Sequence, residues 1–523
     1  MIAPQLDLRM GIDVGGTNTD AVVLDRDGKL LAKVKRSTTA DVSEGVRAAI
    51  DAVVSAPGVD RARITHVMLG TTHATNAIVE RRNLERVAVI RIGSPSSEAV
   101  RPLFGWPADL REAISVAETI VEGGIEFDGK EIVPFDPAAV SRFLEPLQGE
   151  VDSIAITSIF APVSARHELA AEAIVRDLMG SAVHVSLSHE IGSIGLLERE
   201  NACVLNAALV SVVEDVAKAL GTALAANKLE TAVFFAQNDG SLMTLDYALR
   251  YPVLTIGSGP ANSMRGAAYL TGATDGLIAD VGGTSTDLGM LANGFPRESS
   301  AAAEIGGVRT NFRMPDLVAI ALGGGTVVAN GSGGLRIGPR SVGYELEERA
   351  LVFGGDTPTL TDAAVAGGRA NLGSRDATRA KAALLERALE LSDSMLAEAV
   401  DRMKTSRGDC PLIAVGGGSL LVPDNLPGVS EVIRPDHYEV ANAIGAAIAS
   451  VSGQVDRIFY LDKEGGRLGA LEEAQSDARE RAIRAGANPE AVEIVSIEEI
   501  PLTYMTEPAV RIRVKAAGSL GWP

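Results

Sequence analysis

Short apolar segments alternate with amphipathic segments along most of the chain. Apolar runs of about four to eight residues bounded by turn signals predict strands, and apolar residues at every third or fourth position predict helices. The predicted strands are residues 8–12, 21–24, 29–36, 66–70, 87–92, 154–159, 183–187, 232–236, 277–279, 288–291 and 412–415. The predicted helices are residues 41–55, 137–147, 164–179, 198–226, 377–403 and 440–450. This mixture predicts an α/β fold.

The pattern changes near residue 456. A charged helix over residues 472–485 precedes two alternating segments, 492–500 and 509–514, which predict a small α/β appendage. A chain of 523 residues is long enough for several domains. We expect an N-terminal lobe of residues 1–190, a second lobe of residues 191–455 and the appendage at residues 456–523.

One internal repeat organises the chain. Residues 13–20, Asp-Val-Gly-Gly-Thr-Asn-Thr-Asp, recur at 280–287 as Asp-Val-Gly-Gly-Thr-Ser-Thr-Asp. Each copy lies between two apolar segments, and the second segment ends at Asp27-Gly28 or Asn293-Gly294. Each copy therefore predicts a β-hairpin with a small polar tip. Neither copy is a P-loop or a Rossmann fingerprint, both of which open a helix. Two related lobes with such tips predict a cleft between them.

The residues of this repeat suit phosphate chemistry. Glycines let the backbone approach a ligand, and successive N–H groups in such a turn form an anion site. A carboxylate repels phosphate, so Asp13 and Asp280 beside such turns imply a divalent cation, of which Mg²⁺ is typical. Two facing tips would hold a polyphosphate from both sides. The alternative, two ordinary glycine turns, is weakened by the near identity of the copies.

Two other polar segments follow predicted strands. Residues 70–76, Gly-Thr-Thr-His-Ala-Thr-Asn, place His73 where it is either an acid–base group or a surface or capping histidine. Residues 416–419, Gly-Gly-Gly-Ser, suit close approach to a flat ligand such as adenine, or equally a plain turn or helix cap. The histidines show no zinc-binding spacing, and no nucleophile elbow occurs.

The composition of the chain excludes several classes of binding partner. The formal charge of −20 repels nucleic acid and anionic membranes, so neither is an expected partner. No apolar run approaches the roughly 18 residues of a membrane span, and residues 1–10 do not predict a secretory signal. Cys203 and Cys410 are too few for a disulfide framework. These features predict a cytoplasmic protein.

The paired tips resemble the phosphate loops of the superfamily of actin, sugar kinases and heat-shock-chaperone ATPases. Within it, several segments resemble the hydantoinase/oxoprolinase family, hydantoinase A side: residues 9–20, 70–81, 237–240, 257–261, 280–287 and 414–419. The resemblance spans residues 9 to about 450 and is most specific at residues 70–81. It implies a two-lobed actin-like ATPase fold, with duplicated RNase H-like domains around a nucleotide cleft.

The resemblance also implies an ATP-dependent enzyme that acts on a cyclic amide such as a hydantoin, oxoproline or a lactam. Phosphorylation of the amide oxygen turns a poor electrophile into one with a leaving group. Asp13 and Asp280 would organise Mg²⁺ and act in catalysis. The residues implied to hold ATP are Gly15, Gly16, Thr17, Asn18, Thr19, Gly282, Gly283, Thr284, Ser285, Thr286, Gly416, Gly417, Gly418 and Ser419. Those implied to face the substrate are Thr72, His73, Asn76 and Asn238.

The chain departs from the family pattern in three places. His73 replaces a residue that is often small and apolar, residues 338–344 lack the usual cysteine, and the C-terminal region is shorter. The resemblance implies a hydantoinase B-type partner subunit. Three alternatives remain open: a kinase that releases a phosphorylated small molecule, an ATP-dependent carboxylase subunit, and an actin-like or chaperone-like nucleotide switch.

Overall fold

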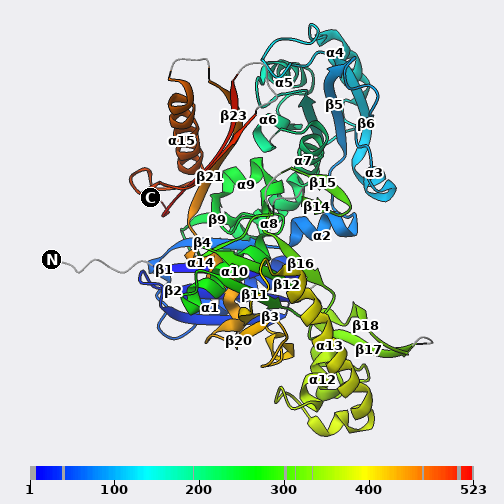
Figure 1. The fold of residues 1–523 in the computed structure, drawn as a ribbon, viewed down its shortest axis with the longest axis vertical. Helices are drawn as coiled ribbons and strands as arrows, with labels where there is room; N and C mark the ends of the chain where they lie inside the picture. Colours follow the sequence, from blue (N-terminus) through cyan, green and yellow to red (C-terminus); the bar gives the residue numbers. More distant parts are fainter. Residues whose placement is uncertain are drawn as a thin grey trace, which may run out of the picture.

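The computed structural model describes residues 8–37, 42–192, 194–299, 303–311, 314–331, 334–461, 465–502 and 508–520. These residues form an elongated α/β molecule with sheets of nine, six and four strands and two small hairpins (Figure 1). The nine- and six-stranded sheets meet in the middle of the molecule, and the four-stranded sheet forms its upper end. The predicted α/β class is therefore confirmed.

The first hairpin begins the nine-stranded sheet, whose order is β22–β23–β21–β10–β9–β4–β1–β2–β3. Strand β2 alternates between two cores: Ala21 and Val23 face helices α1 and α8, and Val22 and Leu24 face α14. This alternation is what a strand covered on both faces requires. The strands are β1 Leu8–Val14, β2 Asn18–Leu24, β3 Leu30–Ser37, β4 Ile64–Thr71, β9 Ala232–Ala236, β10 Leu242–Thr244, β21 Val451–Tyr460, β22 Glu493–Pro501 and β23 Ala509–Gly518. The helices are α1 Val42–Val54, α8 Val210–Ala226, α9 Leu245–Arg250 and α14 Ala441–Ile448.

The C-terminal strands extend this first sheet. Strand β21 pairs with β10 at Val451 and Leu242, and β23 pairs along the whole of β21. Helix α15, Gly466–Arg484, covers the extension with a stripe of alanines spaced four residues apart: Ala470, Ala474, Ala478 and Ala482. The predicted segment 456–523 is α/β as expected, but its strands join a sheet that begins at residue 8. The three-part division by sequence position stays a prediction.

The second hairpin organises the six-stranded sheet in the same way. Asp13 lies opposite Asp20 across β1 and β2, and Asp280 lies opposite Asp287 across β11 and β12. The repeat therefore has the same register in both sheets. The strands are β11 Gly276–Val281, β12 Thr286–Ala292, β13 Phe295–Pro296, β16 Leu317–Ile320, β19 Cys410–Val415 and β20 Val429–Ile433. The neighbouring elements are α10 Ser258–Thr271, α11 Leu346–Arg349, α12 Leu360–Ala366, α13 Ala382–Met403 and the hairpin β17 Thr326–Gly331 with β18 Gly334–Ser341.

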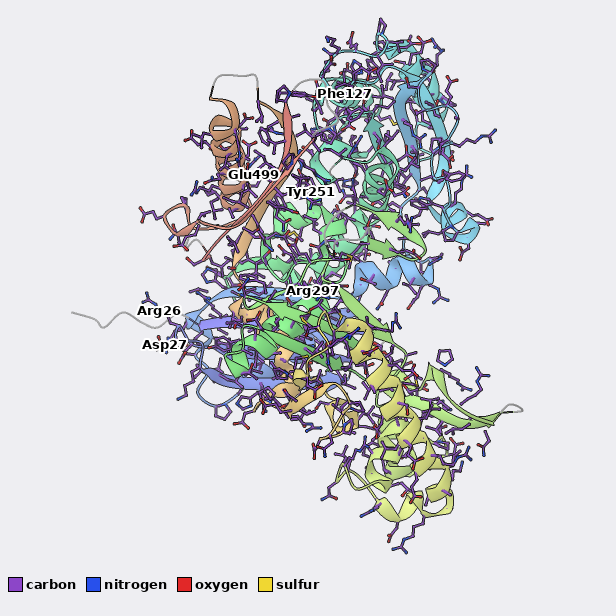
Figure 2. All side chains as sticks on the ribbon, viewed as in Figure 1. Arg26, Asp27, Phe127, Tyr251, Arg297 and Glu499 are labelled. Carbon is purple, nitrogen blue, oxygen red and sulfur yellow. The ribbon has the colours of Figure 1, made fainter. Side chains whose placement is uncertain are left out.

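A four-stranded parallel sheet of order β6–β5–β7–β8 is inserted between β4 and β9. Strand β6 was missed from sequence because its charged and hydroxyl residues interrupt the apolar pattern, as is typical of an edge strand. The hydroxyl of Tyr460 donates to the carbonyl of Phe127, which joins this part to β21. Phe127 is labelled at the upper end of the molecule in Figure 2. The elements are β5 Val87–Ser94, β6 Ser115–Glu122, β7 Ser153–Ser158, β8 His184–Leu187, α2 His73–Glu80, α3 Ala108–Ile114, α4 Pro137–Leu144, α5 Arg166–Met179, α6 Ser188–Ile191, and the hairpin β14 Ala303–Ile305 with β15 Val308–Thr310.

The predicted helix 198–226 is wrong as a single element. The structure has α7, Leu196–Ala208, and then α8, with a break at Leu209. The side chain of Asn206 bonds the backbone of Arg250 and Val253, which anchors the end of α7. Apolar residues continue across the break, so the periodicity gives no sign of the change of direction.

Helices α10 and α14 join the two larger sheets by contact between their backbones. A Cβ atom on Gly266 would lie 1.8 Å from the carbonyl oxygen of Ala441, and one on Gly445 would lie 1.8 Å from that of Asn262. No residue larger than glycine fits at either position without a shift of the helices. The contact therefore sets how the two halves meet.

We expect Gly266→Ala and Gly445→Ala to destabilise the protein, because each methyl group must separate α10 from α14. Overpacking of this kind costs about 1–3 kcal/mol, or more where the backbone must move. Urea unfolding measures the effect. The matched control is Gly221→Ala in α8, where nothing lies within 4 Å of the added Cβ. That change should be neutral or stabilising by up to about 1 kcal/mol because alanine favours the helix. Equal effects at the three positions would contradict the role of the contact.

Candidate functional site

The two glycine turns touch each other. Each turn is closed by the same backbone bond, from the N–H of Gly15 to Asn18 at 3.0 Å and from that of Gly282 to Ser285 at 2.9 Å. A Cβ atom on Gly283 would lie 2.9 Å from Cγ2 of Thr17. The structure thus brings together the two predicted phosphate-binding segments, residues 15–19 and 282–286.

Asp13 and Asp280 lie beside these turns near the ends of β1 and β11. Asn442 of α14 donates to Oδ2 of Asp13 at 2.7 Å, and Ser263 of α10 donates to Oδ2 of Asp280 at 2.6 Å. Burial, followed by the charges of Asp20 and Asp280, raises the pKa of Asp13 to about 7. Burial also raises the pKa of Asp280, against the effect of the Ser263 hydrogen bond. Both carboxylates are therefore costly to ionise without a nearby cation.

The last residue of each repeat adds a carboxylate to the cluster. Asp20 is paired with Lys35 Nζ at 2.6 and 2.7 Å. Among the described residues, Asp287 has no such partner; burial, followed by the charge of Asp280, raises its pKa to about 7. The sequence-based prediction of the site omitted Asp20, Asp287 and Lys35. Asp20 and Asp287 could have been included, because they are the identical last residues of the two copies of the repeat.

Asn262 of α10 lies against Asp13. A Cβ atom on Gly70 would lie 2.4 Å from Nδ2 of Asn262 and 2.5 Å from Oδ1 of Asp13. Asn262 is fully buried, and its amide atoms, like Oδ1 of Asp13, have no hydrogen-bond partner among the described residues. Unpaired buried polar atoms are unfavourable, so this spot is suited to a polar ligand, ion or water. The sequence-based prediction missed three residues of the site, because only the fold brings them next to Asp13 and Asp280: Asn262, Ser263 and Asn442.

The predicted adenosine turn packs on the second glycine turn. Gly416 has φ +82°, and a Cβ atom there would lie 2.4 Å from Oδ1 of Asp280. The N–H of Gly418 donates to the carbonyl of Val281 at 2.7 Å. Gly417 is exposed, and Ser419 is buried with an unpaired hydroxyl. Residues 416–419 thus lie beside Asp280.

The predicted substrate segment 70–76 begins a helix. Thr72 precedes α2, its hydroxyl donates to the carbonyl of Val14 at 3.4 Å, and Nδ2 of Asn76 donates to that hydroxyl at 3.5 Å. Thr72 and Asn76 therefore lie beside the first glycine turn. His73 bonds Thr71 Oγ1 through Nδ1 at 2.6 Å, and burial lowers its pKa.

Asn238 lies apart from these three residues. It follows β9, which runs parallel to β4, and it lines a cavity of about 380 Å³ between the inserted sheet and β21. Asn238 therefore belongs to a neighbouring cavity at the same edge of the sheet, and not to the cluster of Thr72, His73 and Asn76.

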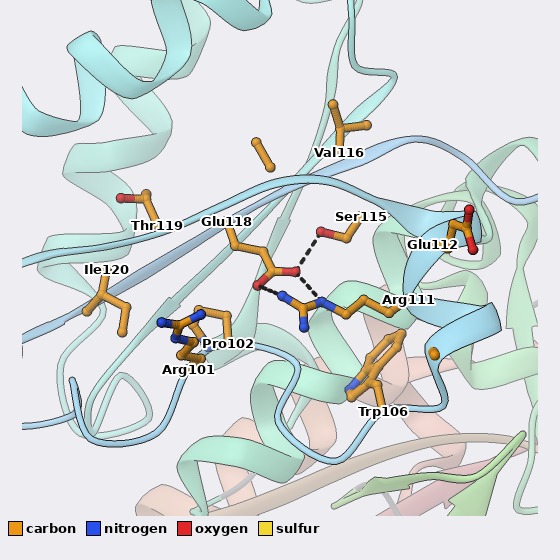
Figure 3. A pocket seen from close by; sticks show the side chains of 12 residues that line it. Arg101, Pro102, Trp106, Arg111, Glu112, Ser115, Val116, Glu118, Thr119 and Ile120 are labelled. Carbon is orange, nitrogen blue, oxygen red and sulfur yellow. Dashed lines mark hydrogen bonds and ion pairs between the residues drawn. The ribbon is translucent and has the colours of Figure 1, made fainter.

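Another cavity, of about 770 Å³, contains none of the predicted site residues. It runs along the edge strand β6, where Arg111 pairs with Glu118 at 2.7 Å beside Trp106 (Figure 3). Within the described residues no cluster of three or more His, Cys, Asp or Glu could hold a metal ion. No helix in the same residues is long and apolar enough to cross a membrane.

We expect Asp287→Asn to stabilise the ligand-free protein more at pH 8 than at pH 5. A carboxyl pKa raised to about 7 means that the folded state loses stability as pH rises from about 4 to 7. At 1.36 kcal/mol per pKa unit, the gain at pH 8 should be about 2 kcal/mol or more. Urea unfolding at both pH values measures it, with exposed Asp376→Asn as control. A gain that is absent or equal at both pH values would contradict this electrostatic account.

Two regions of the chain match sequence models of one protein family. The hydantoinase/oxoprolinase N-terminal region matches residues 9–179, and hydantoinase/oxoprolinase matches residues 199–373. Together they cover more than half of the chain and both glycine turns.

The relatives include named enzyme subunits. Caprolactamase subunit alpha of Pseudomonas jessenii is 26% identical, covering 91% of this chain and 75% of that protein. An uncharacterized protein of Methanocaldococcus jannaschii is 28% identical and the acetophenone carboxylase gamma subunit of Aromatoleum aromaticum 27%, each over 69% of this chain. The chain spans only 56% and 53% of the lengths of these last two.

Two solved structures share the fold over nearly the whole chain. ATP-dependent caprolactamase from Pseudomonas jessenii gives a TM-score of 0.76 at 21% identity, covering 98% of this chain and 88% of that one. Nucleotide-free acetone carboxylase gives 0.73 at 16% identity, covering 99% and 88%. At these identities the similarity concerns the fold, and it bears out the expected actin-like ATPase architecture. With its two matched regions and its paired glycine turns, the chain belongs to the hydantoinase/oxoprolinase family.

Proposed function

We propose that this chain is the ATP-using subunit of a cyclic amidohydrolase. It would transfer the γ-phosphoryl group of ATP to the carbonyl oxygen of a small cyclic amide. The observation that carries the proposal is the contact between two equivalent glycine turns, each beside an aspartate whose pKa is raised by its surroundings. Such a pair offers backbone N–H groups to a polyphosphate from both sides.

The nucleotide would lie between the turns. Residues 15–19 and 282–286 would donate to phosphate oxygens through N–H and hydroxyl groups. Residues 416–419 follow strand β19 beside Asp280, and exposed Gly417 leaves room for a flat group such as adenine. Turns at the carboxyl ends of parallel strands are common places for ligands in α/β folds.

Magnesium fits the donors present. Asp13 has an unpaired buried oxygen, and the raised pKa values of Asp13, Asp280 and Asp287 reflect carboxylates short of positive charge. Mg²⁺ keeps several waters and needs only one or two carboxylates, here Asp13 and Asp280. When bound, it would neutralise charge on the transferring phosphoryl group. Asn442 and Ser263 hold these carboxylates in place.

The substrate would meet the phosphate at the edge of the sheet shared by α2 and the cavity that Asn238 lines. Thr72 and Asn76 contact the first glycine turn, and His73 is adjacent. An amide carbonyl is a poor electrophile, and phosphorylation of its oxygen supplies a leaving group for ring opening. The names of two relatives fit this chemistry: the caprolactamase subunit, and 5-oxoprolinase 1 of Arabidopsis thaliana, which is 26% identical over 64% of this chain and 29% of that protein.

A carboxylase subunit is the second candidate. It is favoured by the 27% identity to a subunit of acetophenone carboxylase and by the fold shared with acetone carboxylase. Phosphorylation of an enolate oxygen uses the same geometry as phosphorylation of an amide oxygen. Two relatives are named as subunits, alpha and gamma, so we propose a partner subunit of the hydantoinase B type for the later step. The need for ATP fits a cytoplasmic location.

The first test is Mg²⁺-dependent phosphate release from ATP by the purified chain. The compounds are hydantoin, 5-oxoproline, ε-caprolactam, glucose, and acetone and acetophenone with bicarbonate. Stimulation by a lactam or hydantoin supports the amidohydrolase, and stimulation by a ketone only with bicarbonate supports the carboxylase. A stable phosphorylated product made without a partner would favour a kinase. Nucleotide-dependent assembly without stimulation by any compound would favour a switch.

We expect Asp13→Asn to lower stimulated ATP turnover by about 10²-fold or more, because it removes charge that the phosphoryl group and its cation require. The same change should raise thermal stability, since burial and neighbouring carboxylates oppose ionisation of Asp13. Loss of turnover together with a gain of stability separates a functional role from misfolding. Exposed Asp177→Asn on α5 is the control and should change neither quantity. Wild-type turnover in Asp13→Asn would contradict the proposed site.

A further inference from the structure

The cavity beside Asn238 contains an acid–base pair that the proposed phosphate site does not use. His189 lines this cavity, and its Nδ1 bonds Oε2 of Glu168 at 2.6 Å. The His189 side chain is 19% exposed, whereas Glu168 is fully buried. Among the described residues, Nε2 of His189 has no partner. The imidazole therefore forms part of the cavity wall while Glu168 fixes its orientation.

Several donors bond the side chain of Glu168. Its Oε1 accepts from the N–H of Ser158 at 2.8 Å and from the hydroxyl of Ser188 at 2.5 Å, and its Oε2 also accepts from the N–H of His189 at 3.1 Å. Arg199 bonds Ser188 Oγ at 2.9 Å and adds positive charge nearby. An acceptor-only carboxylate requires the proton on Nδ1, which leaves the lone pair of Nε2 directed away from Glu168.

The cavity has polar groups that can bind a small amide or ketone. Amide side chains Asn238, Gln454 and Asn311 line it together with apolar residues of the inserted sheet and β21. Four charged residues besides His189 line it, and each has a partner within the protein. Asp456 pairs with Arg511 at 2.7 Å and Arg457 with Asp477 at 3.3 Å. Glu190 pairs with Arg250, and Arg481 donates to the backbone carbonyl of Gln454 at 2.9 Å. Because these charged groups have partners within the protein, the amide side chains are the groups that can bind the carbonyl or N–H of a lactam or the carbonyl of a ketone.

The cavity lies at the same edge of the sheet as Asp13. Ile12, Leu69 and Phe235 are in register across the parallel strands β1, β4 and β9. Asp13 follows one residue beyond this line and Asn238 three residues beyond it. Strands are about 4.8 Å apart, so β9 lies roughly 10 Å from β1, a separation that a nucleotide phosphate and a small ring can bridge.

We propose that His189, oriented by Glu168, is the base that takes a proton from the substrate during phosphoryl transfer. This rests on the proposed function. The carbonyl oxygen forms a bond to the γ-phosphorus, and the bond from that phosphorus to the bridging oxygen of ADP breaks. The amide N–H proton moves to Nε2 of His189, the N–H electron pair forms a C=N bond, and ADP leaves beside the O-phosphorylated imidate. For a ketone, the α C–H proton takes the place of the N–H proton and the product is an enol phosphate.

The pair supplies what this step needs. The N–H becomes acidic as its carbonyl oxygen gains the phosphoryl group, so a neutral imidazole is a sufficient base. Glu168 stabilises the imidazolium that forms, as the carboxylate does in other carboxylate–histidine pairs. His73 is less suited to this role, because its Nδ1 bonds a hydroxyl and no carboxylate orients it.

The test compares His189→Gln and His189→Ala with the wild type, using the compound from the panel above that stimulates ATP turnover most. We expect His189→Gln to lower stimulated kcat by about 10²-fold or more, with ATP affinity unchanged by calorimetry. Added imidazole should restore part of the rate to His189→Ala and none to wild type. His184→Gln is the control: His184 is 43% exposed and lies 3.8 Å from Glu214, so it forms a similar pair outside the cavity.

A stimulated rate in His189→Gln within about threefold of wild type would overturn the inference. If Asp13→Asn loses turnover in the same assay, the proposed function stands while the role of His189 falls. If no compound stimulates the wild type, the proposed function fails, and labelling with diethyl pyrocarbonate decides the placement of the imidazole. His189 should then react faster than His167, whose two ring nitrogens bond Gly124 and Glu131. Equal or slower labelling of His189 would overturn the inference.

Discussion

The approach of two helix backbones, α10 and α14, is the constraint on which the rest of the molecule depends. Glycines at 266 and 445 leave no room for side chains at the crossing. The residues that hold the paired aspartates stand on these same helices: Ser263 on α10 and Asn442 on α14. A change in the crossing would therefore move the partners of both carboxylates at once. The same two helix segments therefore determine both the packing of the core and the geometry at the glycine turns.

The carboxylate cluster lowers the stability of the fold that this packing provides. Asp13, Asp20, Asp280 and Asp287 come together where burial raises each pKa, and Lys35 directly pairs only with Asp20. A fold selected for stability alone would place neutral groups there. A local cluster of unfavourable interactions in the folded state is a common sign of a binding or catalytic site. The large apolar cores around both hairpins, built from fully buried strands, offset that cost.

The local pattern of apolar and polar residues was sufficient to predict the two hairpins and most of the helices. The repeat at residues 13–20 and 280–287 contains its own turn chemistry, so its register could be anticipated in both sheets. Contacts between distant residues could not be anticipated. Asp13 and Asn442 are 429 positions apart, and neither flanking sequence indicates the other. The same holds for the pair Glu168 and His189, since a glutamate within a helix normally reads as a solvated side chain. The path of β21 to β23 into the first sheet was hidden for the same reason.

The first sheet also has a consequence for how the protein is made. Its strands come from residues 8–71, 232–244 and 451–518, so neighbours in space leave the ribosome far apart in time. Until β9 emerges, β4 exposes an open edge that invites pairing with other chains. Closing such long loops also slows folding. A nascent chain of 300 residues already holds both glycine turns, yet it lacks α14 and the amide that holds Asp13. An unfinished chain of this length therefore contains both turns but not the side chain that holds Asp13.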